Sequence, residues 1–255
     1  MKKIIIVARY TFSEAVKSKI LLNIIFLGIA FLLSSYIASE LTFGTPEKTS
    51  LDIGLGLTSI AIKIIAIFYG VNIIQSEIEN RSIYLVLSRP ITKVQYLMGR
   101  LMGMSGILFV NVFILGLISL SLYYFLGGTI DSMMIWTIFF SFIEALLLLL
   151  IVVTCSLFSS KVLSILLGIS AYISGYISST LLESNQFAKT GIFNFVLKFL
   201  NNTIPNFSRL NLKDFILYEQ SISSDVLIGT LLHSSLFILI YLILGSILMK
   251  RKSLD

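Results

Sequence analysis

Long apolar runs separated by short polar segments dominate the chain. A helix needs about 20 apolar residues to cross roughly 30 Å of hydrocarbon, and six runs meet that length. Helices are required, because lipid offers no hydrogen-bond partner to an unpaired backbone group. The pattern predicts an all-α polytopic membrane protein with six transmembrane helices, at about Ile20–Ser39, Gly54–Gln75, Leu101–Leu126, Ser132–Leu157, Val162–Leu182 and Val226–Met249.

Three polar segments complete this single transmembrane domain, residues 1–255. Residues 1–19 are basic and amphipathic, which predicts a helix at the membrane interface with its lysines toward anionic headgroups. A frayed basic tail is the alternative. Residues 76–100 form a long charged loop between two spans. Residues 183–225 are too long for a simple turn, and their apolar stretch 192–200 followed by Pro205 predicts one or two short helices at the outer membrane surface.

Composition agrees with a membrane protein, since 56% of the residues are hydrophobic and 13% are charged, whereas a soluble domain carries about 25% charged residues. The formal charge of +6 follows membrane sidedness rather than a nucleic-acid partner, because cytoplasmic loops are rich in lysine and arginine. With the N-terminus inside, the outer segments hold only Lys48, Lys189, Lys198, Arg209 and Lys213. The inner segments hold Lys2, Lys3, Arg9, Lys17, Lys19, Arg81, Arg89, Lys93, Arg100, Lys161, Lys250, Arg251 and Lys252. Both termini and the 76–100 loop are therefore predicted to be cytoplasmic.

Signatures of enzymes and metal sites are missing from the sequence. There is no phosphate-binding G-x-x-x-x-G-K-[ST] loop, so this chain is not its own P-loop ATPase. Cys155 and His233 are the only residues of their kinds, which rules out an intrachain disulfide and argues against a His-rich metal site. No cofactor is expected.

The stretch Ser76–Gly103 interrupts the apolar runs with charge. Apolar and charged residues alternate at helical spacing up to Leu87, which predicts a short helix. Pro90 disfavours helix at the residue before it. Thr92 and Gln95 then have the spacing of a capping box, which predicts that the next helix begins there. An acidic and basic helix of this type docks on a partner or lies in solvent.

Three consecutive runs in this stretch resemble the ABC-2 family of transporter permeases. They read E-x-E-x-R-[ST]-I-Y, then L-S-[RK]-P-[IV]-[ST]-[RK], then Y-x-x-G-[RK]-x-x-G. The matching residues are Glu77, Glu79, Arg81, Ser82, Ile83 and Tyr84, then Leu87, Ser88, Arg89, Pro90, Ile91, Thr92 and Lys93, then Tyr96, Gly99, Arg100 and Gly103. These matches fall within one combined run of some two dozen residues, and hydropathy extends the resemblance over nearly the whole chain.

The resemblance implies that the chain is a permease subunit of an ABC transporter that works in export. It also implies that this loop is a cytoplasmic coupling helix. Its contacts with a separate ATP-binding cassette ATPase subunit fall on Glu77, Glu79, Arg81, Ser82, Tyr84, Arg89 and Pro90. The family also implies a second permease copy, a homodimer, in the plasma membrane (the bacterial inner membrane). It does not indicate the substrate.

Lys63 and Glu144 are the two charges well inside predicted spans. A charge at a helix centre costs on the order of 2.5–3.5 kcal/mol on insertion scales, so it faces protein or water. Their depths differ by about 5 Å at 1.5 Å per residue, a gap that two long side chains can bridge. The favoured interpretation is a structural ion pair. A role on the translocation path and unpaired snorkelling are the alternatives.

Small residues recur at helical spacing in two places, Gly99 with Gly103 and Ser170 with Ser174 and Ser178. Such faces let helices approach closely in lipid. Packing within the chain and contact with a second copy are both open.

Two other function classes fit the same spans. A membrane scaffold would anchor a complex without moving a solute. An ion-coupled secondary transporter would use Lys63 and Glu144 and act without ATP, although such proteins usually show paired broken helices.

Overall fold

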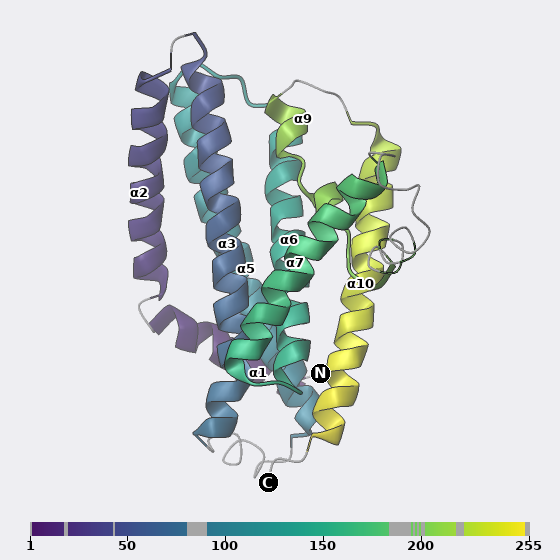
Figure 1. Ribbon diagram of the computed structural model, residues 1–255. Helices are drawn as coiled ribbons and strands as arrows, with labels where there is room; N and C mark the ends of the chain where they lie inside the picture. The colour runs from purple at the N-terminus through teal and green to yellow at the C-terminus, as the bar shows by residue number, and fades with distance from the viewer. Residues whose placement is uncertain are drawn as a thin grey trace. The chain divides into compact units, whose positions relative to one another are not determined.

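The computed structural model describes residues 2–17, 20–42, 44–80, 91–183, 195, 197, 199, 202–217 and 222–252. All regular structure within these ranges is helical (Figure 1). The elements are α1 (Lys2–Lys17), α2 (Ile20–Glu40), α3 (Pro46–Glu79), α5 (Lys93–Phe125), α6 (Ser132–Ser156), α7 (Lys161–Glu183), the 3₁₀ turn η1 (Ser208–Leu210), α9 (Lys213–Leu217) and α10 (Ser224–Arg251).

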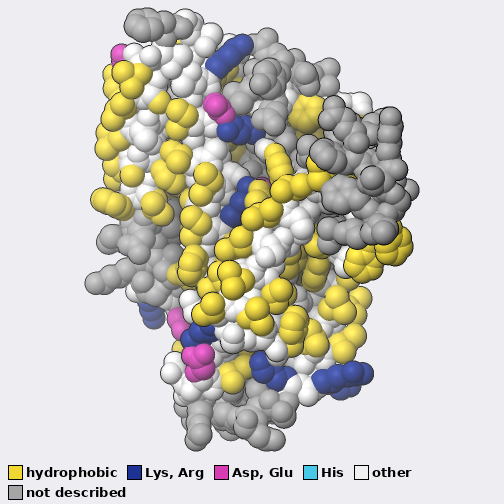
Figure 2. Space-filling model, in the orientation of Figure 1, with side chains coloured by type: hydrophobic (Ala, Val, Ile, Leu, Met, Phe, Trp, Pro, Cys, Tyr) yellow, Lys and Arg dark blue, Asp and Glu magenta, His cyan; other side chains and the backbone are white. Residues whose placement is uncertain are grey.

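Five described helices are long and apolar enough to cross a membrane: α3, α5, α6, α7 over Lys161–Ser178, and α10. Large hydrophobic side chains point outward along them, and Figure 2 shows such side chains over much of the visible face. In lipid this exposure is favourable, whereas a soluble monomer rarely shows so much apolar surface. The prediction of an all-α polytopic membrane protein is confirmed. In α2 the described apolar part is the shorter Phe26–Glu40, so its span stays a prediction.

Helix α3 is longer than the span predicted for it. Its 34 residues measure about 51 Å at 1.5 Å per residue, well over the hydrocarbon thickness. Glu77 and Glu79 belong to its last turn, although the sequence pattern assigned them to a separate short helix. The reason is that the stretch after Gly70 contains neither glycine nor proline, so nothing ends the helix before Glu79.

Helix α5 begins where the capping box predicted. The backbone N–H of Gln95 donates to Thr92 Oγ1 at 3.2 Å, and the backbone N–H of Thr92 donates to Gln95 Oε1 at 3.3 Å. At the other end, Gly127 has φ +98° and the N–H of Gly128 reaches the Tyr123 carbonyl. This ending requires a left-handed residue, which glycine adopts without a steric penalty.

The described helices form two compact units. One comprises Met1–Ile65, Leu87–Ala145 and Leu212–Ser221, and the other comprises Ala66–Val86, Leu146–Asn211 and Ile222–Asp255. Helices α3 and α6 each continue from the first unit into the second.

In the first unit, α1 lies at a steep angle to α2, and both contact α5 (Figure 1). Small residues set the close approaches to α5. A Cβ at Gly28 of α2 would lie 2.9 Å from Ile118, and one at Gly54 of α3 would lie 3.0 Å from Ser119. Thr58 and Ser119 also share a hydrogen bond of 3.4 Å.

In the second unit, α3, α6 and α7 pack around an apolar cluster of Ile67, Val71, Leu148 and Val152. The segment before α9 packs on α7 at Gly175, where a Cβ would lie 2.6 Å from the Pro205 carbonyl and 2.9 Å from Phe207. Phe207 is fully buried and packs near Tyr172 with the two rings tilted and their centroids 5.1 Å apart. A short helix, α9, follows at Lys213–Leu217, and a position of this segment at the outer membrane surface stays a prediction.

Candidate functional site

The predicted coupling residues lie between the end of α3 and the start of α5. Glu77, half-buried, and Glu79, exposed, occupy the last turn of α3. Arg81, Ser82, Tyr84, Arg89 and Pro90 lie outside the described residues. The structure therefore describes the last turn of α3 and the first turn of α5, on either side of these residues in the sequence.

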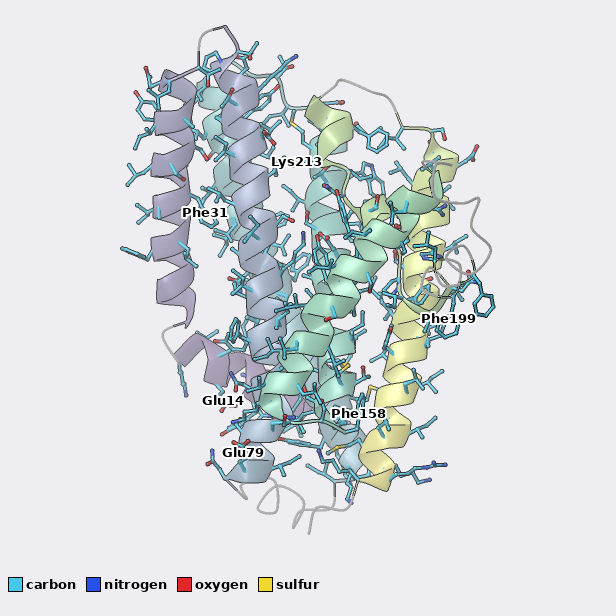
Figure 3. All side chains as sticks on the ribbon, in the orientation of Figure 1. Glu14, Phe31, Glu79, Phe158, Phe199 and Lys213 are labelled. Atoms are coloured by element: carbon cyan, nitrogen blue, oxygen red, sulfur yellow. The ribbon has the colours of Figure 1, made fainter. Side chains whose placement is uncertain are left out.

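The end of α3 is attached to the turn between α6 and α7. Lys161, the first residue of α7, pairs with Glu79, the last residue of α3, at 2.5 Å. One turn earlier, Gln75 Nε2 donates to the carbonyl oxygens of Ser156 and Ser159. Glu79 and Phe158, which stands on the same turn, are labelled in Figure 3. Glu79 thus already has a partner within the chain.

The start of α5 is attached to α1 through Arg100. This side chain is only 8% exposed and pairs with Glu14 of α1 at 2.7 Å; Glu14 is labelled in Figure 3. Arg100 also donates to Tyr96 Oη at 3.0 Å and to Thr11 Oγ1 at 3.3 Å. Its guanidinium lies over the rings of Tyr10 and Tyr96. A buried charge is stable only with such partners, so Arg100 fixes α1 on α5.

Gly99 and Gly103 are the residues of α5 at which α1 approaches most closely. A Cβ at Gly99 would lie 2.5 Å from Val7 Cβ, and a Cβ at Gly103 would lie 2.6 Å from Thr11 Cβ. Val7, Thr11 and Ala15 are the buried residues of α1 and recur every four residues, so they share one face. The Y-x-x-G-[RK]-x-x-G run that carries part of the family resemblance is therefore a docking face for α1.

Lys63 of α3 and Glu144 of α6 meet in the first unit, with Lys63 Nζ 3.1 Å from Glu144 Oε1. Lys63 also donates to Ser59 Oγ at 2.7 Å, one turn away on its own helix. The Glu144 side chain is 4% exposed and the Lys63 side chain 18%. The geometry is that of an ion pair, and whether it also lies on a translocation path stays a prediction.

A second ion pair joins α3 to α9. Lys213, at the start of α9 and labelled in Figure 3, pairs with Asp52. A Cβ at Gly56, one turn from Asp52, would lie 3.1 Å from Lys213 Nζ. No sequence pattern predicts this pair, because its partners are far apart along the chain and neither lies deep in a predicted span.

The serines of α7 do not share one environment. Ser170 is exposed and donates to the Leu166 carbonyl at 2.7 Å. Ser174 is half-buried and donates to the Ala171 carbonyl at 3.2 Å, while Ser178 is 1% exposed. On this helix, Gly175 is the small residue that contacts Pro205 and Phe207. A packing role for the three serines stays a prediction.

Comparison with known proteins decides the family. Residues 5–254 match the family described as ABC-2 family transporter protein. The chain belongs to the ABC-2 transporter family. No curated protein matches it at a significant level. This ABC-2 chain is thus a multi-pass transport subunit by family. The described residues of its sequence motif lie in the last turn of α3 and from Ile91 to Gly103, at the start of α5.

Three groups in this ABC-2 chain were missed by sequence reasoning alone. The partners of Arg100 on α1, Glu14 and Thr11, lie far from it along the chain, so no local pattern pointed to them. Gln75 and the pair of Asp52 with Lys213 had no such pattern either. A glutamine near a span end and a lysine in an outer segment are ordinary in any membrane protein.

Proposed function

We propose that this chain is the membrane-spanning subunit of an ABC exporter, driven by ATP that a separate ATP-binding cassette subunit hydrolyses. The observation that carries the proposal is the charged segment between α3 and α5, in a chain that matches the ABC-2 family over residues 5–254. Before it, Glu79 pairs with Lys161, and after it, Arg100 pairs with Glu14. A pump needs an energy input, and the sequence has no P-loop with which to bind ATP itself. Direction of transport is taken from the family, whose members are mostly exporters.

We propose further that two copies pair to form the pathway, in the plasma membrane of a bacterium, with both termini in the cytoplasm. The excess of lysine and arginine in one set of segments supports this orientation. Under it, the segment after Glu79 faces the cytoplasm, where an ATPase subunit can reach it.

Charge reversal tests the docking role of this segment. Glu77→Lys together with Arg81→Glu is expected to lower ATP-driven transport at least tenfold while membrane insertion and pairing of the permease survive, because a charged helix docks by matched charges. Transport, ATP hydrolysis and co-purification of the ATPase are measured on the same preparation. The matched control is Glu47→Lys with Lys48→Glu at the opposite end of α3, and it should leave coupling intact. Normal coupling in the Glu77 and Arg81 variant would remove the assignment.

Cysteine labelling tests the orientation. In a Cys155→Ala background, single cysteines at Lys48 and Asp131 should react with an impermeant thiol reagent added to intact cells. Cysteines at Arg81 and Arg251 should react only after permeabilisation. The charge bias predicts this result, and labelling of the Arg81 site from outside would reverse the topology.

An ion-coupled secondary transporter is the second candidate, and the pair of Lys63 with Glu144 is the observation that favours it. Transport by the purified chain in proteoliposomes without ATP, driven by an ion gradient, would establish this alternative. Loss of all transport without ATP supports the ABC exporter.

A further inference from the structure

Gln75 of α3 is a polar residue buried among apolar side chains, and it donates hydrogen bonds to the backbone at the end of α6. The residue is 6% exposed. Its Nε2 donates to the Ser156 carbonyl at 2.9 Å and to the Ser159 carbonyl at 2.5 Å. Its own Oε1 is buried without a hydrogen-bond partner among the described residues. Burying an amide is unfavourable unless it is hydrogen-bonded, so these two bonds are what stabilise it there.

The two acceptors are backbone groups at the end of a helix. Ser156 is the last residue of α6, and Ser159 lies in the turn before α7. The last carbonyls of a helix have no backbone donor of their own and need another partner. Gln75 of α3 supplies that donor, so it ends α6 and ties the α6–α7 turn to α3 at once.

Other contacts also join these helices, namely apolar packing around Val152 and a partly exposed ion pair. Gly70 of α3 and Gly168 of α7 both face Val152 of α6, with Cβ positions 3.1 Å and 2.4 Å from it. Such apolar contacts resist separation, yet they are not directional. The pair of Lys161 with Glu79 is partly exposed, at 33% and 59%, and exposed pairs contribute little. Within the described residues, the bond from Gln75 to the Ser156 carbonyl is buried and directional, and the bond to the Ser159 carbonyl is directional and partly buried.

We propose that Gln75 is a positioning residue that makes the end of α3 and the α6–α7 turn move as one piece. The inference rests on the proposed function, in which a partner ATPase acts on the segment that follows Glu79. Through Gln75, movement of that segment is passed to α6 and α7. Without these bonds, α3 moves alone and ATP hydrolysis continues without moving α6 and α7.

Spin labels on the full-length chain test this directly. In a Cys155→Ala background, one label replaces Asn80 at the end of α3 and the other replaces Phe158 on the turn; both positions are exposed. The parent should give one narrow distance distribution, unchanged when ATP is added to the co-purified complex. Gln75→Leu should broaden it, with the attached population falling about tenfold relative to the detached one, or about 1.4 kcal/mol.

Two variants separate this role from general stability. Asn72→Leu, on the exposed face of α3 less than one turn away, should leave the distances unchanged. Gln75→Asn, one methylene shorter, should broaden them as Gln75→Leu does, and it serves if the leucine variant fails to insert. In the complex, both Gln75 variants should keep the ATPase bound and hydrolysing while transport falls.

Two results would overturn the proposal. One is a Gln75 variant whose distances are as narrow as those of the parent. The other is a parent whose distance changes when ATP is added. If no ATPase co-purifies, the proposed function fails, but the distances without ATP still decide whether Gln75 holds the turn on α3.

Discussion

Removing either Lys63 or Glu144 alone is expected to destabilise the protein by about 3–5 kcal/mol, whereas removing both is expected to be far milder. The two groups are 3.1 Å apart, and the Glu144 side chain is 4% exposed. A single replacement leaves one charge in a region of low dielectric without its counter-ion. The double replacement, Lys63→Met with Glu144→Leu, leaves no such charge and fills the space with apolar atoms.

Thermal unfolding in detergent, measured for both single variants and the double variant, checks this expectation. Ser59→Ala is the matched control, because it removes only the second hydrogen bond of Lys63 and should cost about 1 kcal/mol. If the two single effects simply add in the double variant, Lys63 and Glu144 do not interact. A double variant that is stable and keeps its ATPase but does not transport would place the pair on the translocation path.

Gly99→Ala and Gly103→Ala are each expected to lift α1 from α5, at a cost of about 1–3 kcal/mol from overpacking. The new methyl groups would lie 2.9 Å from the Ile4 carbonyl and 2.7 Å from the Ala8 carbonyl. These are backbone atoms, so no change of side-chain rotamer relieves the clash. Once α1 lifts, Arg100 loses Glu14 and Thr11, which adds to the effect.

The chain offers a matched control on the same helix. A methyl group at Gly106 would meet only Phe12, at an ordinary 3.5 Å, and alanine is the better helix former by about 1 kcal/mol. Gly106→Ala should therefore be neutral or stabilising. The measurement is the labelling rate of a cysteine placed at Ala15, which is 7% exposed on α1. Slow labelling in the Gly99 and Gly103 variants, as in the parent, would show that α1 does not depend on these glycines.

The sequence predicted the five long apolar helices α3, α5, α6, α7 and α10, because a helix that crosses lipid needs a long apolar run. The span predicted at α2 stays a prediction. The sequence also located the start of α5 at Thr92, since a capping box is a local signal. The sequence prediction was wrong at the end of α3. The charges of Glu77 and Glu79 suggested a separate short helix, but both residues belong to α3, because no residue before them breaks that helix. Charge predicts where a helix meets water, but it does not predict where the helix ends.

Contacts between distant residues were harder to predict for a physical reason. Lys63 and Glu144 could be paired in advance, because an isolated charge in a span has few tolerable environments. The contacts of Gln75 and Lys213 could not be predicted. An uncharged polar residue, or a charged residue outside a span, has many tolerable environments. The spacing of Gly99 and Gly103 predicted a close helix contact, but only the structure shows that the contacting helix is α1.

Co-purification in mild detergent, followed by an ATPase assay of the co-eluting proteins, tests the central claim most directly. The account predicts that a separate P-loop ATPase elutes with the full-length chain and hydrolyses ATP. It also predicts that Glu77→Lys with Arg81→Glu weakens this association or uncouples it from transport, while Glu47→Lys with Lys48→Glu does neither. A chain that elutes without any ATPase, yet moves solute along an ion gradient or serves only to hold other proteins in the membrane, would contradict it.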